Sequence, residues 1–237
     1  METLFTFTSP PRTCAYLPDR QSSMHYDIVR GITTAEYEDR MNRGWRRFGH
    51  SLFRPECASC KECRSIRVPV ETFHQSRSQK RVWAMNKDVT LSIGEPCVTE
   101  EKLELHRKYH AFQSDFKGWP DHHGSTAEDY TESFVLNPFP TEEWCYHVGD
   151  RLLGVGYVDC VPGGLSAIYF YYDPDERRRS LGTWNVLMVL AAAANRQLPH
   201  VYLGFYVRGC RSLEYKANFR PNQVLDRDTG DWSPFVT

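Results

Sequence analysis

The chain has 237 residues, of which 41% are hydrophobic and 25% are charged, and its formal net charge is −1 at pH 7. This composition is typical of a globular protein with one large domain or two small ones. The balanced charge excludes a uniformly basic surface, so any contact with nucleic acid would need a local basic patch. The longest apolar run, about Trp184 to Ala194, is shorter than the roughly 20 residues of a membrane-spanning helix. The start, METLFTFTSPP, lacks the cationic region of a signal peptide, so we expect a cytoplasmic protein with no membrane partner.

The first half of the chain is polar and rich in turns. Thr33 and Glu36 have the spacing of a capping box, which predicts a short helix through Met41 that ends at Gly44. The segment 43–67 then holds seven Arg or Lys residues against two Glu residues, with aromatic residues interleaved. Basic side chains neutralise phosphates and aromatic rings stack on bases, so this segment is either a nucleic-acid contact or a solvated surface loop.

Three cysteines recur at three-residue spacing within this basic segment: Cys57, Cys60 and Cys63. In a reducing cytosol, clustered cysteines indicate a metal site or catalysis rather than disulfides. A turn can bring three sulfurs round one ion, and tetrahedral zinc needs a fourth ligand, for which Cys14 is the best candidate. Zinc and an iron–sulfur cluster both suit such thiolates, and a loop with free thiols is the alternative.

Four basic residues surround the cysteine triple, and we expect them to lower the thiol pKa values. They are Arg54, Lys61, Arg64 and Arg67.

The middle of the chain contains three predicted helices. A basic helix lies near Ser76–Asn86, and another begins after Thr99 and runs through His110. A loop broken by Gly and Pro follows, and its His122–His123 pair is expected to be exposed to solvent rather than to bind metal. Ser125 to Glu128 reads as a second capping box that begins the third helix.

From residue 143 onward the pattern changes to three strands with turns at Gly149-Asp150 and Pro162-Gly163-Gly164. A long helix near 181–197, the strand VYLGFYV, the helical segment SLEYKANF and a short strand near 223–225 follow. This order resembles that of the GCN5-related N-acetyltransferases and of the aminoacyl-tRNA-dependent peptide transferases. We therefore predict an α+β fold with an acyl-CoA N-acyltransferase type core in residues 96–237, preceded by a basic, cysteine-containing region in residues 1–95.

The start of the long helix carries a candidate anion site. Arg177-x-x-Ser180-x-Gly182 approximates the R-x-x-G-x-G/A sequence with which those acetyltransferases bind pyrophosphate, with Ser in place of the first Gly. Loop amides at a helix N-terminus favour phosphate, so this sequence and the neighbouring Arg178 and Arg179 are predicted to contact tRNA. An arginine-rich helix start without a ligand is the alternative.

Several stretches together resemble the aminoacyl-tRNA–protein transferase family over nearly the whole chain. They are TCAYLPDR, GWRRFGHSLFRP, the cysteine triple, SQKRVWAMNKD, SAIYFYYDPDERRRSLGTWNVL and HVYLGFYVRGCRSLEYKANFRP. The resemblance implies transfer of an amino acid from its tRNA to a protein N-terminus, with a family metal site at the four cysteines.

The compact length and the cysteine pattern resemble the bacterial branch, which transfers leucine to N-terminal Asp or Glu and so creates a degradation signal. Arginyl transfer within the same family, a CoA-dependent N-acetyltransferase and a non-catalytic RNA-binding module remain alternatives.

The chemistry of such a transfer sets its requirements. An aminoacyl ester is already activated, so neither ATP nor a cofactor is required, and the chain has no G-x-x-x-x-G-K-[ST] sequence. In the acyltransferase fold that the chain resembles, two central strands separate, which places the cleft between the strands IYFYYD and YLGFYV. The candidates for catalysis are Asp173, Tyr172, Glu214 and Tyr215. A buried carboxylate must be paired, and the candidates to bind an acidic acceptor are Arg208, Arg211, Lys216 and Arg220.

Overall fold

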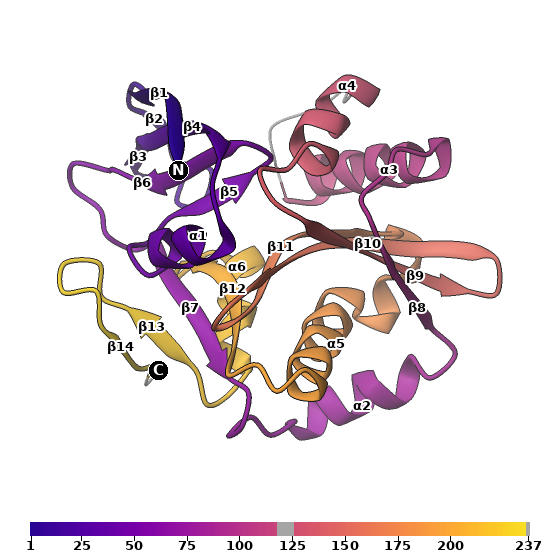
Figure 1. Ribbon diagram of the computed structural model, residues 1–237. Helices are drawn as coiled ribbons and strands as arrows, with labels where there is room; N and C mark the ends of the chain where they lie inside the picture. The colour runs from indigo at the N-terminus through magenta and orange to yellow at the C-terminus, as the bar shows by residue number, and fades with distance from the viewer. Residues whose placement is uncertain (118–125, 236–237) are drawn as a thin grey trace.

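The computed structural model describes residues 1–117 and 126–235, so the His122–His123 pair and Ser125 lie outside the described residues. Two sheets form the framework (Figure 1). The smaller sheet is antiparallel, in the order β1-β4-β6-β5. Its strands are β1 (Glu2–Thr8), β4 (Met24–Gly31), β6 (Ser51–Pro55) and β5 (Arg46–Phe48). A two-stranded ribbon, β2 (Arg12–Thr13) and β3 (Gln21–Ser22), lies within the loop between β1 and β4.

The larger sheet has eight strands in the order β14-β13-β7-β12-β11-β10-β9-β8. Neighbouring strands are antiparallel, except that β11 and β12 are parallel. The strands are β7 (Arg64–Pro69), β8 (Thr90–Gly94), β9 (Thr141–Val148), β10 (Arg151–Val161), β11 (Gly164–Tyr172), β12 (His200–Tyr206), β13 (Gln223–Leu225) and β14 (Trp232–Pro234).

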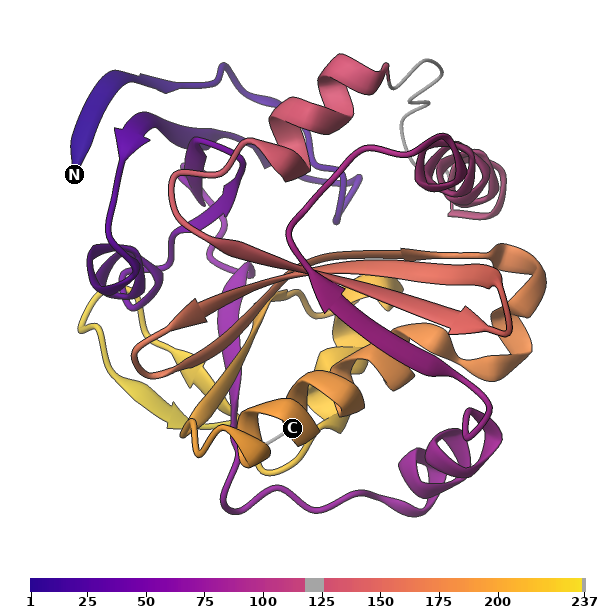
Figure 2. The ribbon, with the colours of Figure 1, turned by 45° about the vertical axis from the view of Figure 1, so that its right-hand side comes forward.

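Helices cover both faces of the larger sheet (Figures 1 and 2). On one face lie α3 (Glu100–Lys117), α4 (Ala127–Tyr130) and the π-helical turn η1 (Thr131–Val135). On the other face lie α5 (Leu181–Asn195) and α2 (Arg77–Met85), which pack against each other. The shorter elements are α1 (Thr34–Met41), η2 (Pro174–Arg179), α6 (Arg211–Glu214) and η3 (Tyr215–Asn218). None of the helices in the described part of the chain is both long and apolar enough to span a bilayer.

Local sequence explains where most helices begin. The predicted capping box of Thr33 and Glu36 is present at α1, and Ser76 with Gln79 caps α2 in the same way. The capping box predicted at Ser125 to Glu128 lies one residue later, where Thr126 pairs with Asp129. Helix α3 continues through Lys117, beyond the predicted end near His110.

Helix α5 is apolar on all sides, in the sequence LGTWNVLMVLAAAAN. A helix without a polar face is stable only when it is enclosed by protein. Leu187 and Val189 are accordingly buried in the main core, between β11 and β12 on one side and α2 on the other. This burial fixes the N-terminus of α5 at the edge of the cavity described below.

The predicted α+β class is confirmed, as are the three consecutive strands, the helix after them and the strands VYLGFYV and Gln223–Leu225. The strands of the first 70 residues were not predicted, because turn-forming residues interrupt their short alternating patterns. The predicted boundary after residue 95 crosses the larger sheet, since β7 and β8 precede it and the other strands follow it. The division into two domains remains a prediction.

A buried ion pair joins the two sheets. Arg47 of β5 donates to Asp159 of β10, and both side chains are almost inaccessible to solvent, at 1% and 0%. The guanidinium also donates to Asn137 at 2.7 Å and Thr141 at 2.6 Å and lies over the ring of Phe139 at 4.7 Å. Because all these partners belong to the larger sheet or the segment before it, Arg47 holds the smaller sheet in place.

We predict that Asp159→Asn lowers the free energy of unfolding by roughly 3–5 kcal/mol, because it leaves a buried guanidinium without its counter-charge. Denaturant unfolding would measure this loss. Asp39→Asn is the matched control, because Asp39 pairs with Arg43 at 2.9 Å on the surface and should cost less than about 1 kcal/mol. Equal losses in the two variants would contradict the role assigned to the buried pair.

Candidate active site

The parallel strands β11 and β12 separate soon after they meet. They pair only from Gly164–His200 to Ser166–Tyr202, although β11 continues to Tyr172 and β12 to Tyr206. Backbone groups inside a protein need hydrogen-bond partners, so the separated strands expose carbonyl and amide groups that other groups must satisfy. The gap lies where the sequence predicted the cleft, between IYFYYD and YLGFYV.

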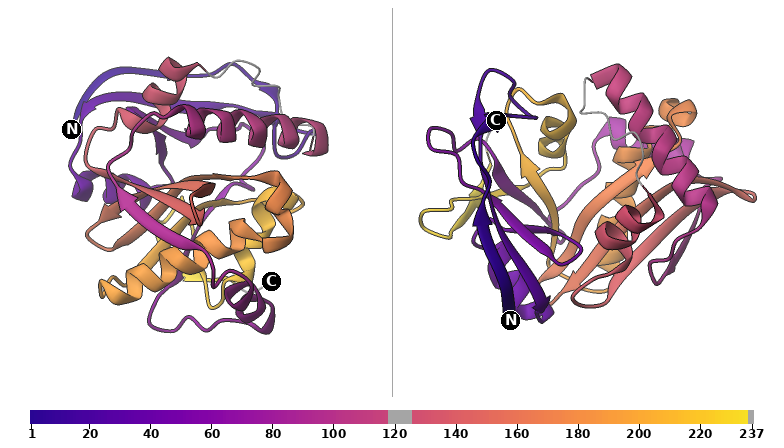
Figure 3. Two further views of the ribbon diagram at one scale, coloured as in Figure 1. Left: turned by 90° about the vertical axis from the view of Figure 1, so that its right-hand side faces the viewer. Right: turned by 90° about the horizontal axis from the view of Figure 1, so that it is seen from above.

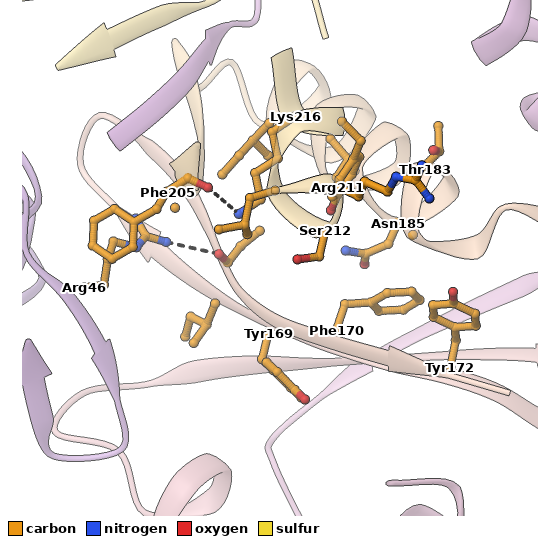
Figure 4. Close-up of a pocket in the computed structure, with 18 of the residues that line it drawn as sticks. Arg46, Tyr169, Phe170, Tyr172, Thr183, Asn185, Phe205, Arg211, Ser212 and Lys216 are labelled. Atoms are coloured by element: carbon orange, nitrogen blue, oxygen red, sulfur yellow. Dashed lines mark hydrogen bonds between the residues drawn. The ribbon is translucent and has the colours of Figure 1, made fainter. Parts of the chain in front are cut away.

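Two cations occupy this gap (Figure 4). Arg46 of β5 donates to the Ala167 carbonyl of β11 at 3.1 Å, and Lys216 of η3 donates to the Phe205 carbonyl of β12 at 2.9 Å. A Cβ atom added at Gly204 would lie 3.6 Å from both the Arg46 guanidinium and the Lys216 ammonium. The two cations therefore flank one point of the backbone, and Gly204 takes a φ of 78° there.

The buried position of Lys216 beside Arg46 changes its protonation. Burial, followed by the charge of Arg46, lowers the pKa of Lys216 to about 7, and the Cys210 thiol opposes this shift. Lys216 can therefore gain or lose a proton near neutral pH. Burial raises the pKa of Tyr215, which also lines the cavity, to about 12, so its hydroxyl remains a donor.

A cavity of about 550 Å³ surrounds the gap. It is lined by the two separated strands, by the N-termini of α5 and α6, by η3 and by β5 and β6 of the smaller sheet. Five of its lining residues are cationic: Arg46, Arg47, Arg177, Arg211 and Lys216. No Asp or Glu of the described chain is among the lining residues, and Arg47 is the only one of these five that a described carboxylate pairs. The cavity therefore suits an anionic ligand.

Many of the residues predicted for the site line this cavity. They are Tyr172, Arg177, Ser180, Gly182, Arg211, Tyr215 and Lys216. Ser180 takes a left-handed conformation and caps α5 without a side-chain hydrogen bond to the helix. The first amides of α5 therefore have no side-chain cap beside the cavity, as an anion site at a helix N-terminus requires.

Two predicted catalytic carboxylates are not among the lining residues. Asp173 caps η2 by accepting from the Asp175 amide at 3.1 Å, and it is paired with Lys108 at 2.6 Å. Glu214 accepts from the Gly209 amide at 2.6 Å. Both carboxylates have structural partners within the protein.

Four predicted basic residues also lie outside the cavity lining. Arg179 is paired with Asp88 at 2.8 Å and with Glu176 at 2.9 Å. Arg220 donates to the Ala217 carbonyl at 3.2 Å. Arg178 and Arg208 are exposed on the surface.

The four predicted cysteine ligands meet at a second cavity of about 270 Å³, which Cys14, Cys57, Cys60 and Cys63 all line. Within residues 1–117 and 126–235, however, no group of three or more His, Cys, Asp or Glu side chains is arranged so that it could hold a metal ion. The cysteines are neighbours, and their sulfurs as placed do not form a ligand set.

The expected lowering of the thiol pKa values is wrong for Cys63. Burial, followed by the three neighbouring cysteines, raises the pKa of the Cys63 thiol to about 12. The basic residues around the triple have other partners: Lys61 pairs with Asp228 at 2.7 Å, and Arg54 and Arg64 lie over aromatic rings. Most of the basic segment is thus used in contacts within the protein.

Arg46 is a candidate site residue that the sequence did not single out. It lies among several arginines of a basic segment, and nothing local separates it from Arg47, which is structural. Strand alternation does indicate that the two arginines differ, because consecutive residues of a strand point to opposite faces. Only the tertiary structure determines which of the two faces the gap.

Comparison with known proteins places the chain in a family. Residues 12–81 match the family model described as arginine-tRNA-protein transferase, N terminus, and residues 101–226 match the model of its C terminus. Solved structures give weaker matches. For example, L-PGS from Bacillus licheniformis is 14% identical, with a TM-score of 0.46 over 68% of this chain and 57% of that chain, which does not establish a common fold.

Curated relatives match almost the full length. An aspartate/glutamate leucyltransferase of Pseudomonas savastanoi pv. phaseolicola is 35% identical over 222 residues, covering 92% of each chain. The protein of the same name from Hahella chejuensis is 35% identical over 232 residues, covering 97% of each chain. That from Helicobacter hepaticus is 34% identical over 223 residues, covering 94% of this chain and 92% of the relative. The chain therefore belongs to the aminoacyl-tRNA–protein transferase family, in which these relatives are named aspartate/glutamate leucyltransferases.

Proposed function

We infer that this protein transfers leucine from leucyl-tRNA to the α-amine of proteins that begin with Asp or Glu, and that the added leucine marks them for degradation. The observation that carries this inference is the cavity at the separated strands, whose described lining has four cations free of described carboxylates and includes no Asp or Glu. Both expected substrates are anionic at the point of contact. The names of the full-length relatives supply the donor amino acid and the acceptor class.

The donor side of the cavity is the N-terminus of α5. Amides without a side-chain cap and the neighbouring Arg177 suit the phosphates near the 3′ end of a tRNA. The ester carbonyl would then lie toward the gap, where amide groups of the separated strands can stabilise negative charge that develops on its oxygen. Arg46 and Lys216 would bind the acidic side chain of the acceptor. The acceptor amine has an ordinary pKa of about 7.7–8.0, so part of it is neutral and nucleophilic at physiological pH.

The same arrangement supports an acyltransferase-like core of the GCN5-related N-acetyltransferase kind. Three antiparallel strands, a crossover helix and a parallel strand that separates from its neighbour lie in the order that the sequence predicted. We propose the cytoplasm as the compartment, because charged tRNA is available there.

The cysteine cluster is proposed as a structural or regulatory metal site, for zinc or an iron–sulfur cluster. Its support is the meeting of Cys14, Cys57, Cys60 and Cys63 at one cavity. Binding of an ion would require the four sulfurs to move closer together. The role is structural or regulatory because the transfer of an activated ester needs no step at this site. The metal content of the purified protein decides this question.

We predict that leucyl-tRNA, and neither arginyl-tRNA nor acetyl-CoA, supports modification of a peptide that begins with Asp. Mass spectrometry would read a mass increase equal to one leucine residue. A peptide that begins with Ala is the control and should remain unmodified. Modification with arginyl-tRNA alone would place the chain in the arginyl branch, and acetylation would refute the family function.

We predict that the double variant Arg177→Ala, Arg178→Ala weakens the binding of leucyl-tRNA and flattens its salt dependence. The logarithmic slope should fall by roughly 0.7–0.9 for each phosphate that the variant no longer neutralises. Titrations over a range of salt concentrations would measure the slope. Arg30→Ala is the control, because Arg30 is exposed on β4, away from α5. An unchanged slope in the double variant would exclude these residues from the tRNA contact.

We predict that Lys216→Met weakens recognition of the acidic acceptor mainly at low pH. The pKa of Lys216 is lowered to about 7, so its positive charge is present below that pH and lost above it. At about pH 6 the variant should raise the KM for an Asp-starting peptide roughly tenfold relative to wild type, and at about pH 8 much less. Lys216→Arg, which keeps its charge at both pH values, is the control. A KM ratio that does not change with pH would exclude this role.

A further inference from the structure

The smaller sheet has one packed face and one open face. Successive side chains of a strand alternate between faces, and the packed face contributes Val29 and Leu52 to a core with α1. The open face carries five aromatic residues and is called the aromatic face here. Its rings are Phe5 and Phe7 of β1, Tyr26 of β4, Phe53 of β6 and Phe48 of β5, and none of them belongs to a described core cluster.

These rings form a continuous track from the edge of the sheet to the cavity. Centroid distances are 5.4 Å from Phe5 to Phe7, 4.9 Å from Phe7 to Tyr26 and 6.2 Å from Tyr26 to Phe53. The track continues over 5.7 Å from Phe53 to Phe48 and over 5.8 Å from Phe48 to Tyr169, which lines the cavity. The outer end of the track thus leads to the gap between β11 and β12.

Strand register places the aromatic face in line with Arg46. Phe7 is paired with Tyr26, Tyr26 with Phe53, and Phe53 with Arg46. A row that begins with an exposed ring on the edge strand therefore ends on a cation in the gap.

The track is open to solvent at its outer end. Phe5 is 61% exposed and Phe7 is 40% exposed, and Phe48 nearer the cavity is 37% exposed. In the described structure β1 pairs only with β4, so its outer edge has free backbone groups. Contiguous exposed aromatic residues are typical of a surface that binds another chain.

Both cavities border the aromatic face. Phe48 and Phe53 line the first cavity and also the second, and Tyr26 lines the second. The second cavity therefore opens beside the track and is large enough for a side chain of a ligand that lies along it.

The charge distribution indicates which substrate lies here. Apart from Arg46 at its inner end, the row is uncharged, and the charged residues that line the second cavity, Arg12 and Glu62, are opposite in sign. A polyanion would need a series of cations, and Arg177 with the N-terminus of α5 provides them at the other end of the cavity. An extended peptide with an acidic first residue matches the uncharged row and the cation at its end.

We propose that the aromatic face binds the extended N-terminal segment of the acceptor protein and directs its acidic first residue to Arg46. This proposal rests on the proposed transfer to acidic N-termini and adds the surface that selects and holds the acceptor. Four strands about 4.8 Å apart span roughly 15 Å, which about five extended residues cover. The residues behind the acidic one are thus expected to contribute to affinity.

The test measures peptide binding by fluorescence anisotropy, without transfer, so that it is independent of the catalytic assay. Asp-starting peptides of about two and about eight residues, labelled at their C-termini, would be titrated with the wild-type protein, with Phe7→Ser and with Tyr26→Ser. Ile93→Ser is the matched control, because Ile93 is 44% exposed on β8, in the other sheet. Thermal unfolding of each variant would confirm that it is folded. Phe7→Leu would be measured as well, because it removes the ring but keeps an apolar side chain at this position.

We expect the long peptide to bind wild type at least fivefold more tightly than the short one, as roughly one additional ring contact provides. Phe7→Ser and Tyr26→Ser should remove most of this difference and leave the short peptide and leucyl-tRNA unaffected, and Ile93→Ser should change nothing. An unchanged length effect in both variants would overturn the proposal. Weaker leucyl-tRNA binding by these variants would also overturn it, because the face would then bind the tRNA end. A wild-type dimer that these variants dissociate would overturn it as well, because the face would then bind a second copy of the chain. Absence of leucyl transfer by the wild type would instead refute the proposed function.

Discussion

The early separation of β11 and β12 is the constraint on which the rest of the site depends. Two strands that stop pairing inside a protein leave carbonyl groups that must find donors, since an unsatisfied buried group costs about 1–3 kcal/mol. Arg46 and Lys216 supply these donors from outside the pair. The same two side chains bring positive charge into the gap. The groups that satisfy the backbone carbonyls are therefore also the groups that make the gap suitable for an anion.

The position of Arg46 depends in turn on its neighbour in β5. Arg47 is held in a buried ion pair with Asp159, which fixes β5 against the larger sheet. Because adjacent side chains of a strand point to opposite faces, fixing Arg47 on one face directs Arg46 to the other, where it reaches Ala167. One of two consecutive arginines is therefore buried in the contact between the sheets, and the other lies in the gap.

The cavity has two chemically different ends, as a transfer between two large substrates requires. Cations and the uncapped amides of α5 lie at one end, and the aromatic face of the smaller sheet leads to the other. The smaller sheet stands beside the larger one (Figure 3). Helix α5 packs in the main core, and its N-terminus lies beside the gap. A tRNA end and a peptide end can thus approach the same point from separate surfaces.

The sequence by itself determined the elements whose signals are local: the capped helices, the strands from residue 141 to 172, the apolar helix α5 and the strand after it. The resemblance to an acyltransferase fold whose two central strands separate also placed the cleft, and Lys216, Arg211 and Arg177 were recognised as charges near it. The short strands of the first 70 residues, whose alternating patterns turns interrupt, were not found. Only the tertiary structure decided which charged side chains already have partners within the protein. Asp173 and Glu214 accept hydrogen bonds from nearby backbone amides, and Arg179 pairs with the distant Asp88. The tertiary structure also decided that Arg46 rather than Arg47 enters the gap, because the face that a strand residue occupies is set by the sheet against which the strand packs.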